Sequence, residues 1–277
     1  MPASCSPASR SNAGRPAPDS MPRTPEARLD GGRAGGAVRV GNTVRRAAGP
    51  WTPAVHALLS HLAGQKFAGS PRPLGTDRQG REMLTFLAGR TVGSTLPWPE
   101  WVHADATLAQ VARWLRGYHD AVADFVPPAG AVWRMGGRWR PGLIIGHNDT
   151  APYNAVWRDA RLAGFFDWDM AGPVTAAEDV AFAAFSWVPL HARHVVTREG
   201  FTEFGRRPQR LRRFLDEYGW TGNASGFLDV VRSRVRTHAA TIRRLAAAGD
   251  PLFTRMVEQG DLGSLDVALA ELDQIRA

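Results

Sequence analysis

The spacing of apolar and polar positions changes along the chain and predicts strands first and helices later. Two short alternating runs, at 37–40 and 43–46, flank a Gly-Asn pair, which is typical of a β-hairpin. A third alternating run at 81–87 predicts another strand. Beyond residue 91, apolar positions recur mainly at helical spacing. A small sheet followed by a larger helical part is the order expected of an α+β fold.

Helical spacing occurs once inside the strand region and repeatedly after it. Apolar positions from Val55 to Leu62 share one helical face, and Thr52 followed by Pro53 is expected to cap and begin this helix. A long helix with an apolar stripe is predicted at 105–125. The later helices are predicted at 175–185, 205–218, 223–247, 251–259 and 263–276.

One segment combines short apolar runs with acids at their ends. The run at 143–145 predicts a buried strand, which turns polar at His147 and leads to Asp149. Asn154 follows, and two further short strands then deliver Asp167. A hairpin would fold Asp167 back beside Asp149 and Asn154. Oxygen ligands of this kind suit Mg²⁺, and a further carboxylate beside them suits proton abstraction.

Spacing of the form His-x-Asp-x-x-x-x-Asn, followed by a strand that ends in Asp, is the pattern of phosphoryl transfer in kinases. The stretches HNDTAPYN and FFDWDMAGPVTAAEDVAF resemble those of the aminoglycoside and choline kinase-like phosphotransferases, which have a protein-kinase-like fold. The resemblance implies that Asp149 is the catalytic base and that Asn154 and Asp167 hold Mg²⁺. It also implies that His147 braces the loop and that Asp179 fixes it through backbone bonds.

The same resemblance implies a two-lobed α+β fold. A reduced N-terminal β-lobe is expected at 30–90 and a mainly helical C-terminal lobe at 91–277. Residues 1–28 are rich in Ala, Pro, Ser and Arg, and we expect a disordered tail because no apolar run there could be buried.

Nucleotide contacts are expected in the small lobe. In the resembling family, the strand at 81–87 leads into a hinge whose backbone receives the purine. Related enzymes set a helix acid against a strand lysine, but the helix at 52–63 has no acid and the hairpin no lysine. Strand alternation puts Arg46 on the opposite face from Arg45, so Arg46 is the best substitute for the phosphate-gripping lysine. The residues expected to contact the nucleotide are therefore Val44, Arg46, Thr85, Phe86, Leu87 and Gly89.

The predicted reaction is transfer of the γ-phosphoryl group of ATP or GTP, with Mg²⁺, to a hydroxyl of a small molecule. The alternative is a catalytically impaired pseudokinase or nucleotide-binding scaffold, which the missing lysine and helix acid favour. Retention of Asp149, Asn154 and Asp167 together argues against it. Asp169 is either a second acid near the metal or a turn residue. Neither the acceptor nor the oligomeric state follows from the sequence.

The composition gives the chain a net positive charge, but the sequence shows no obvious basic patch. The chain has 34 Lys plus Arg against 26 Asp plus Glu, a net charge of +8, and Lys66 is its single lysine. The arginines are spread along the chain, and those at 206–213 and 232–244 are expected to form solvated helix faces. No nucleic-acid-binding signature accompanies them, so we do not expect nucleic acid as a partner.

Nothing in the pattern predicts contact with a membrane. No secretory signal follows the N-terminal charges, and no stretch approaches the length needed to span a bilayer. Cys5 is the single cysteine, which excludes a disulfide within the chain. A cytoplasmic location is the resulting expectation.

Overall fold

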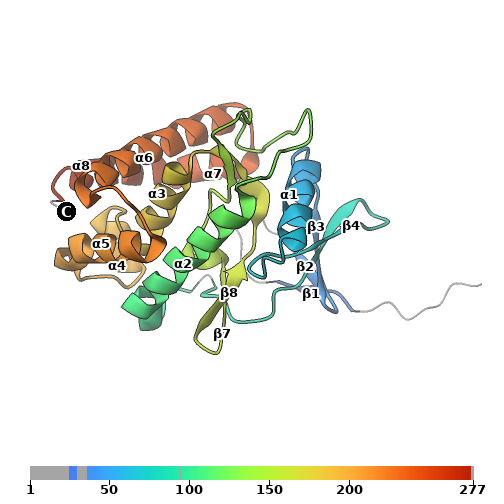
Figure 1. The fold of residues 1–277 in the computed structure, drawn as a ribbon, viewed down its shortest axis with the longest axis horizontal. Coiled ribbons are helices and arrows are strands. Elements are labelled where there is room, and N and C mark those ends of the chain that lie inside the picture. The colour runs from blue at the N-terminus through green and yellow to red at the C-terminus, as the bar shows by residue number, and fades with distance from the viewer. Residues whose placement is uncertain (1–24, 30–35, 94, 276–277) are drawn as a thin grey trace, which may run out of the picture.

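The computed structural model describes residues 25–29, 36–93 and 95–275. A β-rich N-terminal lobe lies beside a larger helical C-terminal lobe (Figure 1). The α+β architecture predicted from the sequence is confirmed. The boundary between the lobes near residue 90 stays a prediction.

The N-terminal lobe is an antiparallel sheet with one helix, α1 (Thr52–Gly64), packed against it. The strands follow the order β1-β2-β3-β5-β4 across the sheet. The predicted hairpin is present, because Val40 is paired with Thr43 across the Gly41-Asn42 turn. The strands are β1 (Ala27–Arg28), β2 (Val38–Val40), β3 (Thr43–Ala47), β4 (Pro73–Thr76) and β5 (Arg81–Thr85).

Three details of this lobe differ from the sequence expectation. Strand β1 lies inside the segment assigned to a disordered tail, and Ala27 pairs with Arg39 of β2. Two residues are too few to produce an alternating pattern, which explains the error. Strand β4 was not expected, and Trp51 rather than Thr52 precedes the first turn of α1. The Thr52 hydroxyl instead accepts a hydrogen bond from the Gly49 N–H at 2.9 Å. The rest of the predicted tail, 1–24, lies outside the described residues.

The C-terminal lobe is built from helices, and the sequence predicted their positions within a few residues except for the short helix at 193–198, which was not predicted. Figure 1 shows α2 running across the middle of the molecule, and it packs against α1, α5 and β8. The helices are α2 (Asp105–Val122), α3 (Ala176–Trp187), α4 (Arg193–Arg198), α5 (Arg207–Tyr218), α6 (Ala224–Ala247), α7 (Pro251–Glu258) and α8 (Asp261–Leu272).

Two antiparallel strand pairs carry the acid-bearing segment. Strand β6 (Ile144–Gly146) pairs with β9 (Gly172–Val174), and β7 (Ala155–Arg158) pairs with β8 (Arg161–Phe165). Gly146 lies opposite Gly172, so the segment between these two residues begins and ends at the same place in the lobe. Strand β9 was not predicted, because a Gly-Pro-Val run carries no alternating pattern.

An aromatic cluster joins α2 to this segment. The Trp114 ring lies 4.6 Å from Phe165, and the Tyr118 ring lies 5.3 Å from Trp168, measured between centroids. Tyr118, Phe165 and Trp168 are buried, and Tyr118 belongs to the predicted apolar stripe of α2. The cluster therefore forms a rigid support under the β7–β8 hairpin.

Backbone contacts join the two lobes. The Phe165 N–H donates to the Gly69 carbonyl at 3.1 Å, and Arg90 and Trp157 exchange backbone hydrogen bonds of 2.7 and 2.8 Å. Gly164 has φ +148, and a Cβ atom there would lie 2.2 Å from the Gly69 oxygen. The close approach of the lobes at this point therefore depends on glycine at position 164.

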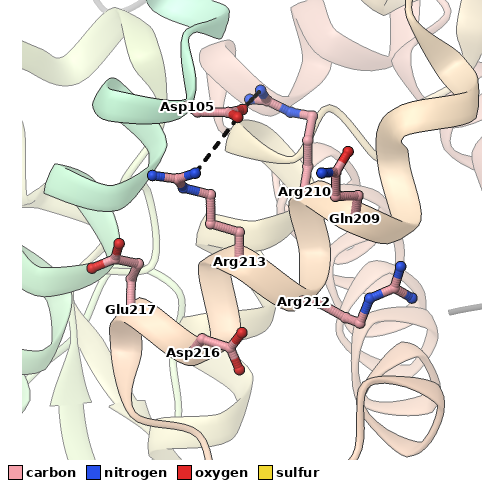
Figure 2. Close-up of a pocket in the computed structure, with 7 residues that line it drawn as sticks. All are labelled: Asp105, Gln209, Arg210, Arg212, Arg213, Asp216 and Glu217. Atoms are coloured by element: carbon pink, nitrogen blue, oxygen red, sulfur yellow. Dashed lines mark hydrogen bonds and ion pairs between the residues drawn. The ribbon is translucent and has the colours of Figure 1, made fainter.

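Several arginines are buried in the fold, which corrects the expectation of solvated helix faces. Arg207, Arg210 and Arg234 are at most 6% exposed. Figure 2 shows Arg210 and Arg213 of α5 reaching the Asp105 carboxylate at the start of α2, at 3.2 and 3.7 Å. These ion pairs hold the α2–α5 junction together.

No helix of the described residues is both long and apolar enough to cross a membrane.

Candidate active site

A buried carboxylate fixes the loop that follows β6. Asp179 lies in the first turn of α3, which begins with a capping box formed by Thr175 and Glu178. Its Oδ1 accepts the Asn148 N–H at 2.9 Å, and its Oδ2 accepts the His147 N–H at 3.4 Å. Asp179 therefore holds the loop through backbone bonds, as the sequence suggested.

The environment of Asp179 keeps its carboxylate charged. Its side chain is fully buried, and the His119 Nε2 lies 3.0 Å from Oδ2. Burial acts to raise the Asp179 pKa, but the bonds from His119 and the Asn148 N–H outweigh it, so the pKa is lowered. His119 in turn contacts the Tyr218 hydroxyl at 2.8 Å. The anchor is thus a fully satisfied polar network inside the core.

His147 links the loop to the segment that carries Asp167. Its Nδ1 accepts the Asp149 N–H at 3.3 Å, and its Nε2 lies 3.2 Å from the Phe166 carbonyl. These partners fit a neutral ring with the proton on Nε2. Burial lowers the pKa of His147 to about 4. Because its side chain is fully buried, His147 is a positioning residue and does not face substrate.

Asp149 is held by two neighbours in its own loop. The Tyr153 hydroxyl donates to Oδ1 at 2.9 Å, and the Asn154 side-chain amide donates to Oδ2 at 2.8 Å. Asp149, Asn154 and Asp167 line one cleft of about 480 Å³, called here the Asp149 cleft. The structure thus brings together the three residues that the spacing predicted. Tyr153 was missed, although its position four residues after Asp149 was a usable signal.

Asp167 follows β8 in a left-handed conformation, with φ 58 and ψ 68. The preceding Phe166 N–H donates to the Asn154 carbonyl at 3.0 Å, which keeps Asp167 close to Asn154. The Asn154 side-chain amide donates to both the carbonyl and the carboxylate of Asp149. Its side-chain oxygen is therefore the atom that could bind a cation.

The set of one carboxylate and one amide oxygen fits Mg²⁺ that is shared with phosphate oxygens. Mg²⁺ usually keeps only one or two protein carboxylates and completes its shell with phosphates and water. Within the described residues, no group of three or more His, Cys, Asp or Glu side chains forms a metal site. The assignment of Asn154 and Asp167 as ligands stays a prediction.

Arg46 reaches from the small lobe to these acids. Its register is as predicted, since it lies opposite Glu82 and shares a strand face with Val44. Its Nε, Nη1 and Nη2 donate to Glu82, Asp167 and Asp169 at 2.5, 2.7 and 2.6 Å. Burial acts to lower the Arg46 pKa, but attraction to the three carboxylates outweighs it and raises the pKa. Arg46 is therefore a permanent cation beside the predicted metal ligand.

Glu82 supplies the acid that the small-lobe helix lacks. It is 1% exposed and lies on β5, and its second oxygen is 3.0 Å from the His56 Nε2 of α1. In contrast to the pattern expected of the family, the acid that pairs with the strand cation comes from a neighbouring strand, and the helix contributes a histidine that contacts this acid. Glu82 was not predicted as a site residue, although alternation puts it on the buried face of β5 with Leu84.

Asp169 is more than a turn residue, because it is a second acid that binds Arg46 beside Asp167. Its Oδ1 accepts from Arg46, and Arg134 lies 3.5 Å from its Oδ2. Burial raises the Asp169 pKa, and the attraction of Arg46 opposes this. Arg134 also pairs with Asp250 at 3.2 Å and stacks on the Trp51 ring of the small lobe at 4.7 Å. Arg134 was missed because nothing in the local sequence marks it.

The predicted hinge residues differ in what their backbone can offer to a base. The Thr85 N–H donates to Arg72 and the Phe86 N–H to Asn42, at 2.9 and 2.8 Å. Among the described residues, the N–H groups of Leu87 and Gly89 have no such partner. Leu87 and Gly89 are therefore the better candidates for purine contacts.

Comparison with known proteins identifies a family whose model covers the segment that carries these acids. The model of a family described as "Phosphotransferase enzyme family" matches residues 132–218, which include the Asp149 loop and the β7–β8 hairpin. The trifolitoxin immunity protein of Rhizobium leguminosarum bv. trifolii is 37% identical over 207 residues, covering 73% of this chain and 77% of that protein. The chain belongs to the phosphotransferase enzyme family.

Solved structures of phosphotransferases share the fold at low sequence identity. An amicoumacin kinase in complex with AMP-PNP, Ca²⁺ and Ami has a TM-score of 0.59 and 9% identity, covering 92% of this chain and 89% of its own. The GDP complex of aminoglycoside 2'-phosphotransferase-IIIa has a TM-score of 0.55 and 14% identity, covering 85% and 89%. This likeness confirms the two-lobed kinase-like fold.

Acid should destabilise this family member through His147. The His147 pKa is 6.5 as an unperturbed group and about 4 in the folded protein, so below pH 6.5 the unfolded state binds a proton that the folded state does not. The free energy of unfolding therefore keeps the full contribution of neutral His147 above pH 6.5 and loses it as the pH falls toward 4. Between pH 7.5 and 5 this loss should be about 2 kcal/mol.

Urea unfolding of the wild type and His147→Asn at both pH values measures this effect. The variant should be less stable at pH 7.5 but should lose less stability on acidification. An equal loss in both proteins would show that His147 is not the buried neutral group that its contacts indicate.

Proposed function

We propose that the chain transfers the γ-phosphoryl group of ATP or GTP to a hydroxyl of a small molecule. The observation that carries this proposal is the convergence of Asp149, Asn154 and Asp167 on one cleft. In this reaction Asp149 accepts the hydroxyl proton, and its orientation is fixed by Tyr153 and Asn154. Mg²⁺ held by Asn154 and Asp167 would neutralise charge on the phosphates. A cytoplasmic location, where such nucleotides are available, is part of the proposal.

Arg46 takes the part of the phosphate-gripping lysine in this proposal. Its bonds to Glu82, Asp167 and Asp169 use one N–H of each guanidinium nitrogen. A guanidinium has five N–H groups, so two remain for phosphate oxygens. Glu82, supported by His56, orients the side chain from behind. The absence of a lysine is therefore weak support for the pseudokinase alternative.

Substitution of the two acids should separate nucleotide binding from turnover. We expect Asp167→Ala to weaken Mg²⁺-dependent binding of ATP or GTP strongly, because a metal ligand is lost. Asp149→Asn should bind the nucleotide normally but lower its hydrolysis or transfer by about 10²- to 10⁴-fold, because only the base is lost. Exposed Asp216→Ala on α5 is the control.

Calorimetric titration with Mg·ATP and Mg·GTP, followed by turnover assays, makes this comparison. Equal nucleotide affinity of the wild type and Asp167→Ala would rule out the metal assignment. A wild type that binds nucleotide but never turns it over would support the pseudokinase or scaffold alternative.

Truncation of Arg46 should lower affinity for the phosphates and not for the base. A charge-assisted contact contributes about 1.5–3 kcal/mol, so Arg46→Ala should weaken Mg·ATP binding by about tenfold to more than a hundredfold. Adenosine, which has no phosphate, should bind equally before and after. Arg45→Ala is the matched control, because Arg45 lies on the other strand face, 3.7 Å from Asp77.

Arg46→Lys keeps the charge beside Glu82 and tests the case in which the alanine variant does not fold. It should bind Mg·ATP more weakly than wild type, because an ammonium cannot form the same planar fork. If Arg45→Ala and not Arg46→Ala lowers the affinity, the phosphates lie on the other face of the strand.

Similarity to an immunity protein favours a protective role for this chemistry. The trifolitoxin immunity protein is 37% identical to this chain. We propose that this chain likewise protects a cell, by phosphorylating a toxic compound.

A trifolitoxin-sensitive strain should grow in the toxin when it expresses the wild type and not when it expresses Asp149→Asn. Equal growth with both proteins would show that protection does not require the proposed base.

A further inference from the structure

The walls of the Asp149 cleft are mainly apolar. Trp98 comes from the segment before α2, Met135 and Met170 from the segments on either side of the acid loops, and Phe182 from α3. Phe253 and Met256 of α7 complete the wall. Methionine and aromatic side chains adapt to an irregular apolar surface, so this lining suits a molecule with a substantial apolar body.

Negative charge is scarce in the cleft outside the proposed reaction centre. Apart from Asp149 and Asp167, the acidic and basic residues that line it are Arg134, Glu199 and His238. Arg134 is already paired with two acids, so Glu199 is the one further carboxylate among the described lining residues. A polycationic amino sugar would have to desolvate several ammonium groups here, most of them without a carboxylate partner.

The cleft continues into a second hollow of about 290 Å³. Trp98, Tyr153, Phe182 and Met256 line both spaces, so the two are adjoining parts of one groove. The second hollow adds ionisable side chains of both signs: His191, His194, Arg198 and Asp261. The extension is therefore not an acidic patch, and it provides room for an elongated acceptor.

We propose that the acceptor is a hydroxylated amphiphile with at most one positive charge. Its hydroxyl lies at Asp149, and its apolar body lies over Trp98, Phe182 and Met256. Tyr153 lies between the two regions, because its hydroxyl bonds to Asp149 while the residue lines both hollows. The position of the hydroxyl rests on the proposed phosphotransferase function, whereas the apolar body follows from the groove alone.

Three probes test this substrate class by calorimetry on the complex with Mg²⁺ and a non-hydrolysable nucleotide. Octyl β-glucoside, below its micelle concentration, carries sugar hydroxyls and an apolar tail. Methyl β-glucoside carries the same hydroxyls without the tail, and kanamycin is a polycation. Octyl β-glucoside should bind at least about tenfold more tightly than methyl β-glucoside, because only its tail can bury apolar surface. It should also bind more tightly than kanamycin.

A matched pair of variants on α7 distinguishes groove binding from general detergent binding. Met256→Gln should weaken octyl β-glucoside binding by about three- to tenfold, because it makes the wall polar at nearly constant volume. Val257→Gln changes an exposed neighbour that lines neither hollow and should leave binding unchanged. Thermal melts of both variants verify that they are folded.

Equal affinity for the two glucosides, tighter binding of kanamycin, or an equal effect of the two variants would overturn the amphiphile assignment. Nucleotide affinity is measured separately on the same preparations. If the wild type does not bind Mg·ATP, this result counts against the proposed phosphotransferase function and not against the shape of the groove.

Discussion

One guanidinium, that of Arg46, lies among three carboxylates from two distant parts of the chain. Glu82 comes from β5, Asp167 follows β8, and Asp169 lies two residues further on. Without a cation between them, these acids would repel each other and resist ionisation in a partly buried space. Arginine suits this position better than lysine, because its planar fork reaches several oxygens at once. The small lobe is thereby joined to the acid loops at the point where the nucleotide phosphates are proposed to lie.

A second buried ion, Asp179, controls the opposite side of the same site. It holds the backbone of His147 and Asn148, and His147 then connects that loop to Phe166, just before Asp167. These bonds lie inside the C-terminal lobe and do not depend on Arg46. The proposed base and the proposed metal ligands are therefore oriented by a preformed network, as catalysis by positioning requires.

Local signals explain which features the sequence revealed. The bounds of most helices follow from periodicity, and Asp149, Asn154 and Asp167 were proposed as site residues because strand ends and short spacings mark them. Glu82 and Arg134 were missed because each gains its meaning from a partner far along the chain. The buried arginines of α5 and α6 were misjudged for the same reason: a helical arginine looks solvated until its carbonyl and carboxylate partners are known.

The proposed reaction centre and most of the apolar groove come from different structural elements. Asp149, Asn154 and Asp167 lie on loops fixed by β-pairing and Asp179, whereas the groove is lined largely by side chains of α3, α7 and the segment before α2. Substitutions in these helices can reshape the wall without moving the acids. A shared fold therefore carries little information about the acceptor, and specificity must be argued from the wall residues of each member. In this chain Phe182 and Met256 line both hollows, so a substitution at either residue changes the shape of the whole groove.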